Sequence, residues 1–322
     1  MREVVRWGII GAGRIAESFA ADIRLVPNAS LAAIASRSRS AAEAFVARHG
    51  GARAYGSYAE MFADDGVDAV YIATPHNLHA EQARAAAAAG KAVLCEKPIA
   101  INPDECRALQ DYARRRQTYL TEGMWTWYLP AIRRAQAWAA AGRIGRVRHL
   151  KADFGYPLPF DAARREYDRV LAGGCLLEMG VYPVAIAALF MHDDPKAINV
   201  AHGLAPNGVE NDVVILYHFE DGGTATLATS FRCKLQNCAY LIGEEGYIAI
   251  PDFWRADSCR LFRLDSEIDR YEDGRRGLGF EFEIESVSTD ILEGRFESRT
   301  VTGADSLRFQ TQMARIRSAI VA

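Results

Sequence analysis

The chain has 322 residues, of which 50% are hydrophobic and 25% are charged. This length and composition are typical of a globular protein with two domains, and they exclude a disordered, collagen-like or coiled-coil chain. Lysine and arginine number 38 against 41 acidic residues, for a formal net charge of −3. Since binding to nucleic acid needs clustered cations and the sequence contains no block of like charges, we expect no nucleic-acid partner.

The N-terminal residues lead directly into a short apolar segment and lack the charged, apolar and small-residue order of a signal peptide. No apolar stretch reaches the roughly twenty residues that a membrane span needs, so we expect no membrane partner. The six cysteines form neither a CxxC pair nor a His/Cys pattern at zinc spacing, which predicts reduced thiols and no metal site. These features together predict a cytoplasmic protein.

About the first 120 residues alternate between strand-like and helix-like segments. The apolar, β-rich segments span residues 4–10, 31–35, 67–73 and 91–95. The helical segments span residues 14–24, 39–49, 57–62, 77–89 and 103–116. Strands that are apolar along their whole length are buried on both faces, so the alternation predicts an α/β fold with a parallel sheet and helices on both sides.

The pattern changes after about residue 121. Strand-like segments then span residues 147–156, 198–203, 213–219, 224–231, 239–242, 247–250 and 260–264. Short turns at 221–223 and 244–246 join some of them, which predicts a largely antiparallel sheet. Helices are expected at 129–141, 175–190, 281–293 and 305–320. The change of pattern predicts two domains, 1–121 and 122–322.

A glycine-rich loop, Gly-Ala-Gly-Arg-Ile-Ala at 11–16, follows the first strand and opens the first helix. It matches the dinucleotide-binding fingerprint with alanine in the third place. Gly11 allows the tight turn, and Gly13 lets a pyrophosphate approach the backbone. Arg14 and Ile15 begin a helix whose free N–H groups favour an anion. We predict that these four residues bind a dinucleotide; the alternative is a tight turn between strand and helix.

The end of the second strand indicates which dinucleotide is bound. NAD enzymes usually carry an acidic residue there, whereas this chain has Ser36 and Arg37, and the next acidic residue is Glu43. Arg37 can pair with a 2′-phosphate and stack on adenine, and Ser36 can donate a hydrogen bond. The sequence therefore favours NADP over NAD, and the alternative is that Arg37 is a solvated loop residue.

Three further motifs occur at 73–79 (Ala-Thr-Pro-His-Asn-Leu-His), 96–98 (Glu-Lys-Pro) and 173–183 (Gly-Gly-Cys-Leu-Leu-Glu-Met-Gly-Val-Tyr-Pro). With these motifs the chain resembles the glucose-fructose oxidoreductase/inositol dehydrogenase (Gfo/Idh/MocA) family over essentially its whole length. It looks most like the branch of dimeric dihydrodiol dehydrogenase and NADP-dependent D-xylose dehydrogenase, because Tyr182 follows the acidic Glu178 by four positions. The inositol dehydrogenase branch has a histidine in that place.

The resemblance implies a fold and an assembly. The family has an N-terminal Rossmann domain with a parallel sheet, followed by a C-terminal α/β domain with an open sheet that often forms the subunit interface. We therefore expect the second domain to bind substrate and to mediate a homodimer or higher homo-oligomer. In the family the loop at 73–79 passes near the nicotinamide and the ribose. The cofactor contacts expected from these motifs are Thr74, Pro75, His76, Asn77, Glu96 and Lys97, while His79 is expected only to start a helix.

The resemblance and simple chemistry give a catalytic pair, Lys97 and Tyr182. Lys97 directly follows a strand of the parallel sheet, at the edge where such sheets bind ligands. Pro98 restricts it to extended geometry, and in the family this peptide bond is commonly cis. A tyrosine can deliver a proton to an alkoxide if a lysine cation stabilises its phenolate. The alternatives are a surface turn for Lys97 and a core aromatic for Tyr182.

Substrate contacts are expected from one acid and several aromatic residues. Glu178 stands where the family usually has aspartate and shares a helix face with Tyr182, so it is a candidate ligand for a substrate hydroxyl. Its alternative is a salt bridge to a basic neighbour. Trp125, Phe154 and Trp254 match positions where the dihydrodiol branch lines its site, and Phe280 is a weaker match. They suit the apolar face of a sugar or a cyclic diol, or belong to the core.

The sequence thus predicts an NADP-dependent oxidoreductase that interconverts a secondary alcohol and a carbonyl on a small polyhydroxylated substrate, such as an aldose, a sugar derivative or a trans-dihydrodiol. No metal is expected, because the nicotinamide carries the electrons. Two alternatives are a non-catalytic nucleotide-binding regulator and a sugar–sugar oxidoreductase with tightly bound NADP. The intact Lys97 and Tyr182 argue against the first, and the lack of a signal peptide argues against the second.

Overall fold

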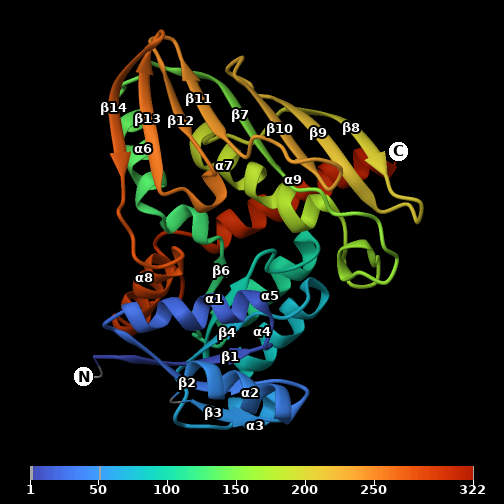
Figure 1. The fold of residues 1–322 in the computed structure, drawn as a ribbon, viewed down its shortest axis with the longest axis vertical. Coiled ribbons are helices and arrows are strands. Elements are labelled where there is room, and N and C mark those ends of the chain that lie inside the picture. Colours follow the sequence, from blue (N-terminus) through green and yellow to red (C-terminus); the bar gives the residue numbers. More distant parts are fainter. Residues whose placement is uncertain (1–2, 51, 322) are drawn as a thin grey trace. The chain divides into compact units, whose positions relative to one another are not determined.

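The structure is a computed structural model that describes residues 3–50 and 52–321 (Figure 1). Its contacts divide the chain into two compact units. The first comprises residues 1–125 and 275–307, and the second comprises residues 126–274 and 308–322. A single boundary near residue 121 therefore does not describe this division, because the segment 275–307 returns to the first unit.

A six-stranded parallel sheet forms the centre of the first unit, with strand order β3-β2-β1-β4-β5-β6. Its strands are β1 (Val5–Ile10), β2 (Ala29–Ala35), β3 (Arg53–Tyr55), β4 (Ala69–Ile72), β5 (Ala92–Glu96) and β6 (Leu120–Gly123). The order reverses between β1 and β4, and this switch point is where doubly wound sheets bind ligands at the carboxyl ends of their strands. The parallel Rossmann-type sheet predicted from the sequence is confirmed.

The helices of the first unit differ in whether a side chain caps their first turn. They are α1 (Arg14–Asp22), α2 (Arg39–His49), α3 (Tyr58–Phe62), α4 (His79–Ala88), α5 (Pro103–Arg115) and α8 (Phe280–Leu292), with short 3-10 turns η1 (Ile23–Leu25) and η2 (His76–Leu78). Ser38, Ser57 and Asn102 each accept a backbone N–H at the start of α2, α3 and α5. Such caps satisfy N–H groups that have no partner within the helix. The helix α1, in contrast, starts at Gly13 without a side-chain cap.

Two strands of this sheet are not predicted from the sequence. The strand β3 has only three residues and is partly exposed, so it gives no apolar run. The strand β6 reads Leu-Thr-Glu-Gly, although all four residues are buried. A buried glutamate and a glycine break the β-rich pattern on which the prediction depends.

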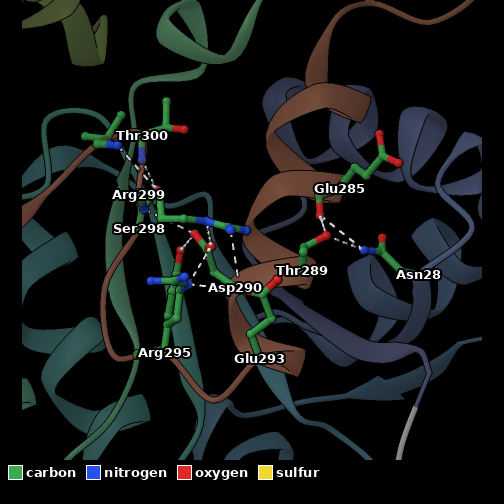
Figure 2. Close-up of polar contacts among 11 residues, drawn as sticks. Asn28, Glu285, Thr289, Asp290, Glu293, Arg295, Ser298, Arg299 and Thr300 are labelled. Atoms are coloured by element: carbon green, nitrogen blue, oxygen red, sulfur yellow. Dashed lines mark hydrogen bonds and ion pairs between the residues drawn. The ribbon is translucent and has the colours of Figure 1, made fainter.

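The helix α8 attaches the returning segment to the first unit. The indole of Trp7 donates a hydrogen bond to Ser288 (3.0 Å). The amide of Asn28 donates to the hydroxyl of Thr289 (2.9 Å) and to the carbonyl of Glu285 (3.2 Å), as Figure 2 shows. These contacts join α8 to residues more than 250 positions earlier in the chain, and no local sequence pattern reports such a pairing.

A buried carboxylate fixes the segment that follows α8. Asp290 is fully buried, and its oxygens lie 2.7 Å from Nε of Arg299 and 3.6 Å from Nε of Arg295 (Figure 2). Its carboxylate also accepts the hydroxyl of Tyr119 and the backbone N–H of Arg299, each at 3.3 Å. Both guanidinium groups reach Glu293 as well, at 3.0 and 3.4 Å. A buried carboxylate is tolerated when cations and hydrogen bonds replace its hydration, as they do here.

Replacement of Asp290 by alanine should lower the free energy of unfolding by about 2–3 kcal/mol, since two hydrogen bonds and two charge contacts are lost together. Urea denaturation followed by circular dichroism measures this change. The matched control is Glu245→Ala, which removes the partner of Arg263 in an exposed ion pair at 3.3 Å, and it should cost less than about 1 kcal/mol. Equal effects of the two substitutions would contradict the role given to Asp290.

An eight-stranded sheet forms the second unit, in the order β14-β13-β12-β11-β7-β10-β9-β8. Its strands are β7 (Val147–Gly155), β8 (Ala197–Leu204), β9 (Glu210–His218), β10 (Thr224–Ser230), β11 (Ala239–Gly243), β12 (Tyr247–Ile250), β13 (Ser258–Arg263) and β14 (Ser266–Glu272). The β10–β7 pair is parallel, and the other neighbouring strands are antiparallel. The largely antiparallel sheet is confirmed, including the two hairpins predicted from the turns at 221–223 and 244–246. The strand β14 is not predicted, because it is a polar edge strand.

Helices pack on one face of this sheet. They are α6 (Pro130–Ala140), α7 (Val181–Met191) and the part of α9 (Gly303–Val321) that belongs to the second unit, with short turns η3 (Trp125–Tyr128), η4 (Arg165–Tyr167), η5 (Leu176–Gly180) and η6 (Phe253–Arg255) (Figure 1). Burial alternates along β10 and β13, so one face of these strands is covered and the other is open. The helix predicted at 175–190 is in fact a π-helical turn, η5, followed by α7. Whether copies of the chain associate through the open sheet stays a prediction.

Candidate active site

The glycine loop between β1 and α1 leaves the start of the helix open. Gly11 has a φ of +92°, and a Cβ there would lie 2.6 Å from the carbonyl oxygen of Ala73, so this position requires glycine. A Cβ on Gly13 would meet no heavy atom within 4 Å. Arg14 and Ile15 are exposed. The loop therefore offers the N–H groups at the start of α1 to an anion, with open space beside Gly13.

The end of β2 places Ser36 and Arg37 at the start of the turn into α2. The hydroxyl of Ser36 accepts the N–H of Ser38 (3.3 Å). Arg39 is paired with Glu43 (3.3 Å), whereas no described carboxylate is bonded to the exposed Arg37. Arg37 is thus the guanidinium at this turn that is available to an additional phosphate.

The loop after β4 carries Thr74, Pro75, His76 and Asn77. The two ring nitrogens of His79 lie 2.7 Å from the carbonyl oxygens of Thr74 and of Pro98, so this histidine ties the loop after β4 to the loop after β5. His79 is buried and starts α4, as expected. The Oδ1 atom of Asn77 is buried and has no hydrogen-bond partner among the described residues. A buried acceptor of this kind suits a ligand that brings its own N–H or O–H group.

Glu96 and Lys97 lie at the carboxyl end of β5. The hydroxyl of Tyr71 donates to Glu96, and the other carboxylate oxygen accepts the backbone N–H of Lys97 (3.2 Å). The Lys97–Pro98 peptide bond is cis, as the resemblance implies. The ring of Tyr71 stacks on Phe19 of α1, with centroids 3.8 Å apart. Buried contacts therefore link the backbone of Lys97 to the helix that follows the glycine loop.

A second buried acid, Glu122, ends β6 beside this loop. It accepts the backbone N–H of Ile99 (3.0 Å) and a hydrogen bond from Ser306. Burial raises the pKa of Glu122 to about 7; the neighbouring Glu96 also raises it, while Lys97 and the hydrogen bonds lower it. The charge of the Glu122 carboxyl thus changes near neutral pH. This carboxyl and Lys97 interact electrostatically.

The stability of the chain should fall with increasing pH because of Glu122. The pKa of Glu122 is about 7 in the folded state, compared with an ordinary value of 4.5 when the chain is unfolded. Between pH 4.5 and pH 7 the folded state therefore binds more protons than the unfolded state. The free energy of unfolding should then decrease across this window by up to about 3 kcal/mol. The variant Glu122→Gln should lose that dependence.

Thermal unfolding of the wild type and of Glu122→Gln between pH 4.5 and 8 measures the difference. Glu60→Gln, at an exposed position of α3, serves as the control and should follow the wild-type curve. Parallel curves for the wild type and Glu122→Gln would show that Glu122 does not titrate in this window.

Three of the predicted residues in the second unit lie together. The ring of Phe154 stacks on Trp254 with centroids 4.8 Å apart, and Tyr182 meets both rings edge to face at 5.4 and 6.1 Å. They come from β7, η6 and α7. The hydroxyl of Thr126 donates to the carbonyl of Trp254 (2.7 Å) and holds its backbone in place. The ring of Tyr182 thus belongs to an aromatic cluster with Phe154 and Trp254.

Trp125 stacks on another of the predicted aromatic residues. It belongs to the first unit, where its ring stacks on Phe280 at 4.5 Å with an interplanar angle of 9°. Both rings are buried. Phe280 in turn meets Phe19 edge to face at 6.5 Å. The rings of Trp125 and Phe280 are therefore in direct contact. The sequence alone does not indicate this pairing.

Glu178 forms the salt bridge that the sequence analysis left open as its alternative role. The two oxygens of its carboxylate accept hydrogen bonds from the two terminal nitrogens of Arg165, at 2.9 and 3.0 Å. The sequence gives no reason to select Arg165 among its neighbours. The signal that could have found it is the glycine at 173, where a Cβ would lie 2.8 Å from the carbonyl oxygen of Arg165.

No group of three or more His, Cys, Asp or Glu side chains in the described ranges is arranged to hold a metal ion. The cysteines are not joined in disulfides. Within the same residues, no helix is long and apolar enough to span a bilayer.

Comparisons with known proteins identify related sequences over nearly the whole chain. Residues 5–124 match the model of the Gfo/Idh/MocA oxidoreductase family with an NAD-binding Rossmann fold, and residues 132–249 match that of the GFO/IDH/MocA C-terminal domain. The chain is 34% identical to the trans-1,2-dihydrobenzene-1,2-diol dehydrogenase of Homo sapiens over 98% of this chain and 97% of that protein. The Sus scrofa enzyme is 31% identical with the same coverage.

Solved structures show the same fold over nearly the whole chain. A 3-ketoreductase from Actinomadura kijaniata, in complex with NADP and TDP-benzene, is 27% identical with a TM-score of 0.86, and 98% of each chain is covered. The aldose-aldose oxidoreductase of Caulobacter crescentus, complexed with glycerol, has a TM-score of 0.90 at 24% identity and covers 99% of this chain and 98% of that one. The latter similarity concerns the fold alone.

Proposed function

Because the chain belongs to the Gfo/Idh/MocA oxidoreductase family, we propose that it is an NADP-dependent enzyme that interconverts a secondary alcohol and a carbonyl on a sugar, a sugar derivative or a cyclic trans-dihydrodiol. The observation that carries the proposal is the open glycine loop at α1, linked by buried contacts to Glu96 and Lys97 at the end of β5. The relatives named for a dihydrodiol and for a 3-keto group support this class of substrate.

The residues around the loop fit a bound NADP. The start of α1 has no side-chain cap and open space at Gly13, and Asn77 has an unused buried acceptor. Arg37 would hold the 2′-phosphate, with Ser36 beside it. Thr74, Pro75 and His76 would flank the nicotinamide half, as the resemblance implies. When bound, the nicotinamide supplies or accepts the hydride.

Replacement of Arg37 by alanine should weaken NADPH binding at least tenfold and leave NADH binding nearly unchanged, because only NADPH carries the phosphate that this cation would bind. Fluorescence quenching on titration with each cofactor gives both affinities. The matched control is Arg39→Ala, since Arg39 is already paired with Glu43. An equal loss of affinity for both cofactors in Arg37→Ala would contradict the NADP preference.

We further propose that Tyr182 exchanges a proton with the reacting oxygen, donating it during reduction and accepting it during oxidation. Lys97 would supply positive charge that stabilises the alkoxide and the phenolate. Phe154 and Trp254, which contact Tyr182, would lie against the apolar face of the substrate. Glu178 would accept a substrate hydroxyl.

Tyr182→Phe should lower kcat by about 10²–10⁴-fold, which is the usual contribution of a positioned acid or base. The ring contacts with Phe154 and Trp254 are kept, so NADPH affinity should not change. Steady-state kinetics together with cofactor titration test this expectation. Tyr247→Phe, in β12, removes a tyrosine hydroxyl that has no assigned role and should retain full turnover. Unchanged kcat in Tyr182→Phe would remove Tyr182 from the reaction.

The test of the function itself is titration with NADPH and NADH, followed by a panel of aldoses, inositols and dihydrodiols monitored by nicotinamide absorbance. Tighter binding of NADPH and turnover of a panel member would support the proposal. Binding without turnover would favour the regulator. A cofactor retained through purification would favour the sugar–sugar oxidoreductase. Failure to bind either cofactor would overturn the interpretation of the glycine loop.

A further inference from the structure

The side chains of Arg165 and Glu178 form a two-pronged ion pair. The Nη1 and Nη2 atoms of Arg165 each donate to a different carboxylate oxygen, at 3.0 and 2.9 Å. The two side chains are 31% and 23% exposed, so the pair is partly withdrawn from water. Contacts of this fork-like kind fix the direction of the carboxylate as well as its charge.

The glycine at 173 lets the backbone at Arg165 and Glu166 approach the segment before η5. A Cβ on Gly173 would lie 2.8 Å from the carbonyl oxygen of Arg165 and 2.7 Å from that of Glu166. The N–H of Gly174 donates to the carbonyl of Glu166 (2.9 Å). The turn η4 therefore lies directly against the segment that leads into η5, and a larger residue at 173 would push Arg165 away from Glu178.

The backbone around Arg165 is held in place from its other side. Tyr167 is buried, and its hydroxyl donates to the carbonyl of Leu158 (2.7 Å). Its ring meets Phe231 and Phe160 edge to face at 5.4 and 5.1 Å. Arg165 thus projects from a turn whose backbone is held in place by the contacts of Tyr167.

Carboxylates outnumber guanidinium groups in the contacts around Arg165. Arg165 also lies 3.7 Å from a carboxylate oxygen of Glu166, so one guanidinium faces two carboxylates. Burial alone would lower the pKa of Arg165, but the hydrogen bond and charge of Glu178 outweigh burial and raise it. The guanidinium of Arg165 is thus engaged by the carboxylate of Glu178 and lies close to that of Glu166.

Glu178 belongs to the same continuous segment as Tyr182. It lies in the π-helical turn η5, and Tyr182 is in the first turn of α7, which follows directly. Each carboxylate oxygen can accept more than one hydrogen bond, so the bonds from Arg165 leave acceptor capacity for the hydroxyl groups of a substrate. A negatively charged substituent at the same place would instead meet two carboxylates and a cation that is already paired.

We propose that Arg165 is a positioning residue that fixes Glu178 as an acceptor for substrate hydroxyls, and that the pair selects neutral polyhydroxylated substrates against anionic ones. This inference rests on the proposed function, because it places the substrate near Tyr182. It adds to that function the charge class of the substrate.

The first test is Glu178→Gln, which keeps the shape of the side chain and leaves Arg165 without its principal partner. Substrates are compared in matched pairs that differ by one carboxylate: glucose with glucuronate, galactose with galacturonate, and a trans-dihydrodiol with its ring-carboxylated analogue. The ratio of kcat/KM for the anionic member to that for the neutral member should rise at least tenfold in the variant, mainly through KM. A ratio that stays at the wild-type value in folded Glu178→Gln would overturn the inference.

The matched control is Glu244→Gln. Glu244 accepts hydrogen bonds from two nitrogens of Arg148, so it forms a comparable Arg–Glu pair in the same unit, but on an exposed turn between β11 and β12. Its substitution should leave the ratio unchanged. A rise in the control equal to that in Glu178→Gln would also overturn the inference, because it would then reflect net charge alone.

The second test removes the positioning partner. Arg165→Met keeps an apolar stem but removes the two hydrogen bonds that orient Glu178, so KM for the neutral substrate should rise. Arg165→Lys restores a positive charge and should recover part of the affinity. A purely structural role would lower the melting temperature without a selective rise in KM and without recovery by lysine, and that result would contradict the proposal.

A binding measurement separates this inference from the proposed function. If the wild type turns over no neutral member of the panel, the proposed function fails, and isothermal titration of glucuronate and glucose with NADP present decides the inference alone. Glucuronate binding that is stronger in Glu178→Gln than in the wild type would support selection by charge. Equal glucuronate binding by both would overturn it.

Discussion

The buried hydrogen bond from Tyr71 to Glu96 is the contact on which the arrangement of Lys97 and the glycine loop in the first unit depends. Tyr71 comes from β4, Glu96 ends β5, and the ring of Tyr71 stacks on Phe19 of α1. Glu96 also accepts the N–H of Lys97, so the residue proposed to act at the substrate oxygen is fixed through a carboxylate that is itself fixed from two sides. The glycine loop precedes α1, so the same few contacts orient both the anion-binding helix and Lys97. A buried carboxylate that accepts hydrogen bonds from both of these groups favours one orientation of the surrounding backbone over others.

Much of this could be predicted from the sequence because it is local. The strand, the glycine loop and the helix of residues 5–22 follow one another, and the chemistry of each is contained in a few neighbouring residues. The position of Lys97 at a strand end follows from the same alternation of strands and helices. Elements without a local signal are missed. The strand β6 is buried but contains Glu122, and β14 is polar because it is exposed at an edge. The return of residues 275–307 depends on bonds such as Trp7 to Ser288, which no periodicity encodes.

The candidate site shows the same limit. The sequence marks Phe154, Tyr182 and Trp254 as separate candidates, and only the structure shows that their rings are in contact. It treats Trp125 like the others, although that ring is stacked on Phe280 in the first unit. Some acids in the first unit interrupt the apolar sequence pattern of a buried core, and Glu283 is one of them. Its burial raises its pKa well above the ordinary value, and the nearby Glu96 raises it further. Such costly groups are more common near functional sites than in ordinary cores.

The edges of the eight-stranded sheet differ in chemistry, with β14 at one end and β8 at the other. The strand β14 reads Ser-Glu-Ile-Asp-Arg-Tyr-Glu, and its charged side chains discourage a strand of another molecule from pairing with its free backbone groups. The strand β8 reads Ala-Ile-Asn-Val-Ala-His-Gly-Leu and carries no acid, lysine or arginine. Growth of this sheet by addition of foreign strands is therefore opposed by charge at the β14 edge and is directed to the β8 edge. The β8 edge is accordingly the side from which aggregation of a partly unfolded chain would begin.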